Sequence, residues 1–415
     1  MKEYKLSNGI KIIYKQNNSE LSSICISIDA GAVRDGEILG VAHATEHMVY
    51  KGTATRSEKQ INEELSRIFG FQNAMTNYPY VIYYGTLLNE DLECGLELFS
   101  DILINPSFPT MGFKEEIDVI KEELKEWDEE IEQYCEDKLF FNSMENRRIK
   151  YPIIGTKQSL ESLSLKAIKE FYNKYYCPSN CVVTVISSLE FDRVKDMLEK
   201  QFGIWQKKVN LEEVIKTKIE KQAEIETNVN PKKGYFLNHK KGMSSSKVQI
   251  IFPIHQFGHL EIKALRIFNQ YFGEGVNSVL FDTLRTKYGL VYDILTRVCH
   301  EEFIKVYKIT YSTSYDNVQK SIDIIEEIIK GVKNLKNTIT DEDIKLLARS
   351  FRLKRLFAEE QSVRLAKELA TYDTMFGDYN IYLDESKDME NLSVDFIIEV
   401  AVKVLENMSI QIISE

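Results

Sequence analysis

The chain has 415 residues, of which 43% are hydrophobic, 28% charged and 11% aromatic. This balance predicts a globular protein of two to three domains and excludes collagen-like, low-complexity and largely disordered chains. The net charge of −11 disfavours a protein that follows nucleic-acid phosphates. No stretch approaches ~18 consecutive apolar residues, and the N-terminus lacks a signal-peptide or transit-peptide pattern. We therefore expect a cytoplasmic protein with neither nucleic acid nor a membrane as partner.

Hydrophobic periodicity gives the order of elements in the first half of the chain. Strands are predicted at 10–14, 23–29, 79–87 and 182–186, and helices at 40–50, 57–69, 90–104, 112–142 and 164–176. The segment 209–233 is highly charged, lacks aromatic residues and contains Asn-Pro, which is typical of a linker. We therefore expect an N-terminal domain at 1–208 and a C-terminal domain at 234–415.

The second half repeats the pattern of the first half. Ser23 precedes the strand CISI, and Ser246 precedes the strand VQII. The helices that follow these strands end at Gly52 and Gly275, an offset of 275 − 52 = 223. The shared order predicts a duplicated domain of ~200 residues. The expected fold class is α+β, with two similar domains that each consist of a helix-covered β-sheet.

The most specific pattern lies at residues 40–48, GVAHATEHM. His43 and His47 are spaced i and i+4, so that a helix places both imidazoles on one face, where they can bind one metal ion. Glu46 can reach a metal-bound water without being a ligand. This is the H-x-x-E-H arrangement, in which Zn²⁺ lowers the pKa of its water to about 7 and the carboxylate takes the proton. The alternative, two surface histidines that cover a helix, is disfavoured because four positions in five residues are specified.

A third protein ligand has to come from another part of the chain. The acidic helix expected at 112–128 has an apolar stripe formed by Phe113, Ile117, Ile120, Leu124 and Trp127. At about 100° per residue, Glu116 and Glu123 both lie about 70° from the centre of this stripe. Glu115 and Glu122 point almost directly away from it. A ligand at a partly buried site is therefore expected at Glu123, with Glu116 on the same edge, although a run of acids by itself more often forms a solvated face.

With these residues the sequence resembles the M16 (pitrilysin/insulinase) metallopeptidases, especially the short two-domain members related to the mitochondrial processing peptidase. In that family a glutamate ligand follows the HxxEH motif by about 76 residues, and here 123 − 47 = 76. The resemblance also includes residues 8–9 (NG), 47–53 (HMVYKGT), 73–74 (NA) and 103–106 (LINP). It implies a LuxS/MPP-like metallohydrolase fold whose two domains form a clam shell.

The resemblance also implies a role for each residue of the site. Zn²⁺ is expected to be bound by His43, His47 and Glu123. Glu46 is expected to act as general base and then as proton donor to the leaving amine. The family places a second, supporting acid seven residues before the glutamate ligand, and 123 − 7 = 116 selects Glu116.

A segment of the second half resembles the family segment that carries an Arg and a Tyr seven residues apart. It has the sequence LFDTLRTKYGLVY at 280–292, in which 292 − 285 = 7. The resemblance implies that Arg285 and Tyr292 reach across the interdomain cleft toward the zinc-bound peptide. A guanidinium and a phenol there can donate hydrogen bonds to the scissile carbonyl or a neighbouring one. Without the resemblance, Arg285 is interpreted as a surface charge.

The duplicated half is expected to carry no metal site of its own. Adding 223 to 43, 46 and 47 gives Arg266, Asn269 and Gln270, which do not form a plausible zinc trio. One domain is therefore expected to be catalytic, while its copy supplies walls and substrate contacts.

The resemblance implies a zinc-dependent endopeptidase that hydrolyses short or unfolded peptides in a closed interdomain chamber. Substrate is expected to bind as an added strand on a sheet edge. Two alternatives stay open: a dedicated leader or precursor-peptide peptidase that works with a paralogous partner chain, and a noncatalytic peptide-binding or assembly subunit. The expected assembly is a homodimer or a heterodimer with a paralogous chain.

Overall fold

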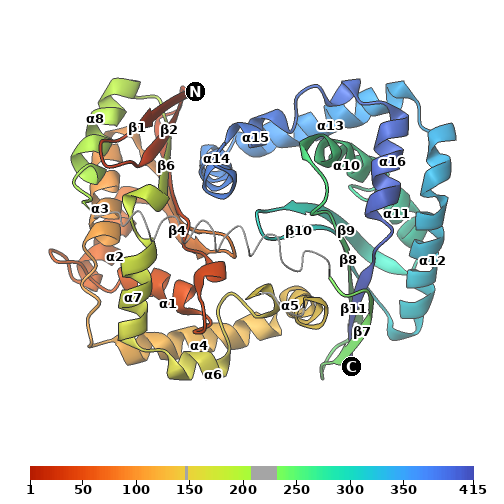
Figure 1. The fold of residues 1–415 in the computed structure, drawn as a ribbon, viewed down its shortest axis with the longest axis horizontal. Helices are drawn as coiled ribbons and strands as arrows, with labels where there is room; N and C mark the ends of the chain where they lie inside the picture. Colours follow the sequence, from red (N-terminus) through yellow and green to blue (C-terminus); the bar gives the residue numbers. More distant parts are fainter. Residues whose placement is uncertain (145–147, 207–230) are drawn as a thin grey trace. The chain divides into compact units, whose positions relative to one another are not determined.

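The chain separates into two compact units, each built on its own sheet (Figure 1). The computed structural model describes residues 1–144, 148–206 and 231–415. Of the described residues, unit 1 comprises Met1–Glu126, 151–206 and Ala358–Tyr382; unit 2 comprises 127–144, 148–150, 231–357 and Leu383–Glu415. Most of the linker predicted at 209–233 lies outside the described residues. Within them, no helix has the length and apolar character needed to cross a membrane.

Unit 1 is built on a sheet whose six described strands lie in the order β1-β2-β6-β3-β5-β4. The strands are β1 (Lys2–Lys5), β2 (Lys11–Gln16), β3 (Leu21–Ile28), β4 (Phe69–Thr76), β5 (Val81–Leu88) and β6 (Cys181–Ser187). β2 and β6 are parallel, and the other neighbouring strands are antiparallel. The central strands β3 and β6 are buried at nearly every position. Because successive side chains point to opposite faces, both faces of this sheet need cover.

Helices provide this cover in unit 1. They are α1 (Val41–Val49), α2 (Glu58–Ile68), α3 (Leu92–Ile104), α4 (Phe113–Glu129), α6 (Lys157–Ser162), α7 (Leu165–Tyr175), α8 (Phe191–Phe202) and α14 (Ser362–Phe376). α1 contacts α7 and the edge strand β4, and α3 contacts β5. α14 packs on β3, β5 and β6.

Among the described residues, unit 2 repeats the strand order of unit 1 without a counterpart of β1. Its described strands lie in the order β7-β11-β8-β10-β9, with β7 and β11 parallel as β2 and β6 are. They are β7 (Gly234–His239), β8 (Ser246–Pro253), β9 (Val291–His300), β10 (Lys305–Thr313) and β11 (Ser409–Ser414). The helices are α5 (Ile131–Ser143), α10 (His259–Phe272), α11 (Val279–Phe281), α12 (Val318–Gly331), α13 (Asp341–Glu359) and α16 (Val394–Val404), with α15 (Asn380–Asp384) at the boundary to unit 1. The predicted α+β class, with one helix-covered sheet in each half, is confirmed.

Each half of the sequence supplies one helix to the other half's sheet, which differs from the predicted continuous domains. α14, within the expected C-terminal domain, packs on the sheet of unit 1, where Ser362 and Ser23 share a 2.8 Å hydrogen bond. α5, within the expected N-terminal domain, packs on β7, β8 and β11 of unit 2. There the Lys308 ammonium lies 3.0 Å from the Glu136 carboxylate. The physical reason is that both sheets have a buried, partly polar second face, and these helices cover it.

Two predicted elements also differ from the structure. The helix expected at 112–142 is broken at Glu130, whose ψ of 96° is extended, and its two parts, α4 and α5, belong mainly to different units. The strand β4 was not predicted. Its exposed Gly70 and Asn73 interrupt the period-2 apolar pattern that would have indicated it.

Candidate metal centre

Helix α1, which carries His43, Glu46 and His47, has a tightly fixed beginning. Gly40 precedes it with a φ of 85°, and a Cβ there would lie 2.4 Å from the carbonyl oxygen of Ile154. The buried carboxylate of Asp35 accepts hydrogen bonds from the backbone N–H of Gly40 at 2.7 Å and from that of Ala42 at 2.9 Å. Two features thus set where α1 begins. One is a close backbone approach that only glycine allows, and the other is a capping carboxylate from outside the helix.

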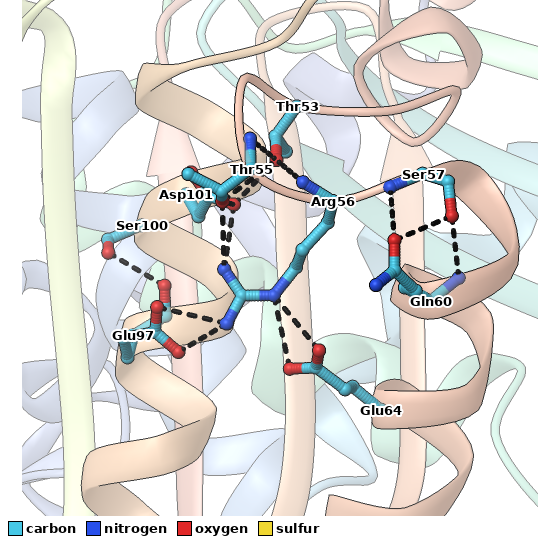
Figure 2. A network of polar contacts seen from close by, with 9 residues as sticks. All are labelled: Thr53, Thr55, Arg56, Ser57, Gln60, Glu64, Glu97, Ser100 and Asp101. Atoms are coloured by element: carbon cyan, nitrogen blue, oxygen red, sulfur yellow. Dashed lines mark hydrogen bonds and ion pairs between the residues drawn. The ribbon is translucent and has the colours of Figure 1, made fainter.

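The segment that follows α1 is held by a polar network around Arg56 (Figure 2). The guanidinium lies 2.8 Å from Asp101, 2.7 Å from Glu97 and 3.1 Å from Glu64. Thr53 also donates to Asp101 at 2.6 Å. Burial raises the pKa of Asp101, but hydrogen bonds from Thr53 and Arg56 outweigh it and lower the pKa. The network ties the segment that follows α1 to α2 and α3.

His43, His47 and Glu123 converge at one point. The two imidazole centroids are 4.6 Å apart on the same face of α1. Nε2 of His43 lies 3.5 Å from Oε1 of Glu123, and Nε2 of His47 lies 3.5 Å from Oε2. One potential ligand atom from each residue lies within 4.8 Å of the other two. Tetrahedral zinc with bonds near 2.0–2.1 Å separates its ligand atoms by ~3.3 Å, so this donor set and its spacing fit Zn²⁺.

The charges of the trio favour its convergence in the metal-free protein. Burial alone would lower the pKa of His47, but hydrogen bonds with Glu116 and Glu123, with the nearby charge of Glu46, raise it to about 10. Burial raises the pKa of Glu123, but hydrogen bonds with His43 and His47 outweigh it and hold that pKa well below its usual range. A cation that replaces the His47 proton therefore meets a preformed site with a negative carboxylate.

Glu116 contacts the trio through His47. Its Oε1 lies 2.7 Å from Nδ1 of His47, which leaves Nε2 of the same ring facing Glu123. Lys51 pairs with the other oxygen of Glu116 and lies 2.7 Å from Glu58. Burial raises the pKa of Glu116, but hydrogen bonds from His47 and Lys51 lower it, so that it is a carboxylate. A carboxylate on the non-ligating nitrogen orients the imidazole and increases its basicity.

Glu46 is 8% exposed, and its carboxylate is held by a residue of β4 rather than by one of α1 or α4. The Thr76 hydroxyl, at the end of β4, donates to Oε2 of Glu46 at 2.6 Å. Tyr50 and Tyr83 lie near this carboxylate, and burial, with the Glu46 charge among the further causes, raises the pKa of both phenols well above the ordinary value. On this side the described groups near the carboxylate are hydroxyls, that of Thr76 and those of Tyr50 and Tyr83.

Comparisons with known proteins match two consecutive stretches of the chain to models of one family. Residues 11–157 match the model described as Insulinase (Peptidase family M16), and residues 162–351 match Peptidase M16 inactive domain. The chain belongs to the M16 peptidase family. An uncharacterized zinc protease of Bacillus subtilis, YmxG, is 28% identical over 83% of this chain and 81% of its own length. An uncharacterized zinc protease of Rickettsia felis is 24% identical over 98% and 95%.

Part of the chain is also similar to the mitochondrial-processing peptidase subunit beta of Dictyostelium discoideum, with 28% identity over 48% of this chain and 43% of that protein. Two solved structures share the M16 fold. A protease from Helicobacter pylori has a TM-score of 0.83 at 20% identity and covers 100% of this chain and 99% of its own. A protein from Pseudomonas fluorescens described as a peptidase M16 inactive domain has a TM-score of 0.82 at 15% identity, covering 100% and 97%.

In this M16 chain, the second predicted pair lies in unit 2. Arg285 is on a π-helical turn, η5 (Asp282–Lys287), and Tyr292 is the second residue of β9. The Arg285 guanidinium lies 4.7 Å from the centre of the Tyr292 ring and 4.8 Å from that of Phe281. Tyr292 is 82% exposed. The structure thus brings the two residues together on the surface of their own unit, and π-helical turns are frequent at functional sites.

Within unit 1 of the M16 chain, the structure brings together all five predicted site residues. On α4, Glu115 and Glu122 are exposed, whereas Glu116 is buried and Glu123 half-buried beside the histidines. Sequence reasoning missed Asp35 and Thr76. Asp35 precedes α1 by several residues rather than at the usual cap position, and no sequence signal indicates that contact. Thr76 could have been found only by recognising that the unpredicted β4 ends beside α1.

Proposed function

We propose that the protein is a zinc-dependent endopeptidase that hydrolyses short or unfolded peptides. The observation that carries this proposal is the convergence of His43, His47 and Glu123, with ligand atoms within 4.8 Å of one another, beside the buried carboxylate of Glu46. Two nitrogens and one carboxylate oxygen leave a fourth position for water, as in catalytic rather than structural zinc sites. The names of the relatives as zinc proteases support the choice of metal.

The protein's own residues divide the work of hydrolysis among them. When bound, Zn²⁺ supplies an acidified water and polarises the scissile carbonyl. Glu46 takes a proton from the attacking water and then gives it to the leaving amine. Thr76 occupies only one oxygen of this carboxylate, so the other remains for proton transfer. Glu116 holds His47 in the orientation in which Nε2 faces the metal position.

We propose that the edge strand β4 binds the peptide backbone. β4 is at the end of the described sheet of unit 1 and contacts α1. Phe71 and Asn73 on this strand are exposed. A peptide that adds a strand to such an edge forms main-chain hydrogen bonds with little dependence on sequence, which suits an enzyme for extended and unfolded substrates.

We further propose that Arg285 and Tyr292 complete the site when the two units enclose the substrate. This proposal comes from the family resemblance and is supported by the contact between the two side chains. Their guanidinium and phenol hydrogens would donate to carbonyl oxygens of the peptide, where negative charge develops in the transition state. An enclosed chamber of this kind would exclude folded proteins and accept short or unfolded chains.

The Glu46→Gln variant tests the proposed function. We expect it to bind zinc with the parent's stoichiometry, measured by elemental analysis, and to lose at least 100-fold in kcat on an unstructured fluorogenic peptide, because its amide cannot accept the proton. Glu122→Gln, an exposed acid on α4, is the matched control and should retain parental kcat. Parental activity in zinc-loaded Glu46→Gln would contradict the proposal, as would a purified parent that binds no zinc.

A second candidate function is a precursor-peptide peptidase that acts together with a paralogous chain. The similarity to a protein named as a subunit, the mitochondrial-processing peptidase subunit beta, favours it. The two candidate functions differ in whether the purified chain cleaves peptides without a partner. A homodimer or monomer that cleaves peptides alone supports the self-sufficient enzyme. Activity that requires addition of a paralogous chain, with co-elution of the two, supports the second candidate.

A further inference from the structure

We propose that Thr76 is a positioning residue for Glu46, linking the peptide-binding edge strand to the general base; this inference rests on the proposed function. The Thr76 hydroxyl lies 2.6 Å from Oε2 of Glu46, and both side chains are buried. This distance is in the range of charge-assisted O–H···O⁻ hydrogen bonds, which are stronger than neutral ones.

The bond can hold the carboxylate in only one orientation. A threonine hydroxyl has a single proton to donate, and Thr76 makes no other side-chain hydrogen bond within the described parts of the chain. Threonine is β-branched, so its χ1 has few accessible values. One oxygen of Glu46 is therefore fixed toward β4, and the rotation of the second oxygen is fixed with it. A carboxylate held this way needs no reorientation before it accepts a proton.

The place of Thr76 in the sheet connects substrate binding with this orientation. Thr76 is the last residue of β4 and pairs with Val81 of β5, while Asn73, three residues before it, is exposed on the same edge strand. A peptide that pairs with β4 would order the strand that carries the hydroxyl. We therefore expect the loss of the hydroxyl to lower kcat rather than to raise KM.

Unit 2 offers a matched control for this contact. Thr296, on the edge strand β9, donates to Oδ1 of Asn269 on α10 at 2.6 Å. The same oxygen also accepts from Tyr307 at 3.0 Å. This threonine makes a bond of equal length to a helix that carries no metal ligands. A purely structural role for such bonds predicts similar effects of removing either hydroxyl.

The test compares Thr76→Val, Thr76→Ser and Thr296→Val in the zinc-loaded full-length protein. For Thr76→Val we expect kcat on an unstructured fluorogenic peptide to fall about 10-fold to 100-fold, with KM within threefold and zinc affinity within twofold of the parent. We also expect a peptide hydroxamate, whose hydroxyl would be bound by Glu46, to bind about 10-fold more weakly by calorimetry. Thr76→Ser should restore most of kcat, and Thr296→Val should leave it unchanged.

Several results would overturn the proposal. These are parental kcat in Thr76→Val, equal losses in Thr76→Val and Thr296→Val, or a loss that parallels loss of zinc. Comparison with Glu46→Gln separates the two levels of inference. If Glu46→Gln is inactive and Thr76→Val is not, only the role of Thr76 fails. If the parent cleaves no peptide, or Glu46→Gln cleaves as fast as the parent, both proposals fail.

Discussion

The helices α1 of unit 1 and α10 of unit 2 occupy similar places in two sheets of the same strand order, yet their polar residues are used differently. In α1, the Nε2 atoms of His43 and His47 both face one carboxylate, that of Glu123, at 3.5 Å. Two imidazoles and a carboxylate that share one point form a site that a divalent cation fits.

In α10, the corresponding residues are an arginine and two amides, which bond to other groups of unit 2. Arg266, Asn269 and Gln270 are the residues that the sequence offset places opposite His43, Glu46 and His47. Arg266 pairs with Glu385 at 2.9 Å, Asn269 accepts from Thr296 at 2.6 Å, and Gln270 accepts from Lys354 at 2.8 Å. The amides of Asn269 and Gln270 also both donate to Oε2 of Glu274, whose other oxygen lies 2.9 Å from the Lys354 ammonium. The comparison teaches that a candidate metal site needs convergence of acceptor atoms, because the Glu274 carboxylate beside α10 is instead surrounded by N–H donors of the protein.

The largest effect expected from this comparison is that of Glu123→Gln, which removes the point of convergence. Gln lacks the negative charge that balances the metal, so zinc affinity should fall by more than the ~100-fold that loss of an outer partner causes, and peptidase activity should fall with it. Chelator competition measures the affinity. Glu122→Gln, one residue away and exposed, should keep zinc and activity. A zinc-replete Glu123→Gln would show that the ligand set is different.

A smaller effect is expected for Arg285 of unit 2, which we propose to supply a positive charge near the substrate rather than a metal ligand. Arg285→Ala should lower kcat by ~10²–10³-fold with zinc content unchanged, because it removes a donor to developing oxyanion charge. Lys287→Ala removes a positive charge from the same π-helical turn and serves as the control. Peptidase kinetics beside elemental analysis measure both. Equal kinetics for the two variants would limit unit 2 to a structural role.

The sequence sufficed for the parts of this comparison that depend on local spacing. The i, i+4 spacing of His43 and His47 and the helical position of Glu123 are properties of single helices, and the structure has them on the expected faces. The sequence does not show which sheet α5 and α14 cover, because this depends on contacts between distant segments.

For the same reason Thr76 and Asp35 could not be predicted. The exposed, irregular edge strand β4 has too weak an apolar period to be recognised, and its end meets α1 only in the folded sheet. Asp35 caps α1 from a preceding turn, five residues before Gly40, and this sequence separation matches no common capping pattern. Thr76 and Asp35 reach the site only through tertiary contacts, which the sequence does not reveal. The three ligands instead lie on one short motif and one helix, whose local spacing the sequence does reveal.

A largely buried histidine of unit 2, His300, predicts that the folded protein loses stability in acid independently of the metal site. Burial, with the nearby charge of Lys305, lowers the pKa of His300 to about 4. Its unfolded value is near 6.5, so below that pH the unfolded chain binds a proton that the folded His300 does not. The contribution of neutral His300 to stability is therefore fully present above pH 6.5 and is lost as the pH falls toward 4. At pH 5 the loss amounts to about 2 kcal/mol.

His300→Gln tests this prediction in metal-free protein, so that release of zinc does not contribute. We expect the difference in urea unfolding free energy between pH 7 and pH 5 to shrink by about 2 kcal/mol in this variant. His239→Gln, at an exposed histidine on β7, should leave the difference unchanged. If His300→Gln and the parent lose the same stability over this range, other groups account for the acid sensitivity.

The smallest expected effect distinguishes a supporting carboxylate from a ligand. Glu116→Gln keeps an oxygen that can accept from Nδ1 of His47 but loses the charge that strengthens this bond, so zinc affinity should fall about 10-fold to 100-fold. At saturating zinc, kcat should return to within a few-fold of the parent, because Glu116 reaches the site only through His47. If Glu116→Gln instead loses zinc as completely as Glu123→Gln, then Glu116 is itself a ligand. The convergence of ligand atoms that separates α1 from α10 would then involve four protein residues rather than three.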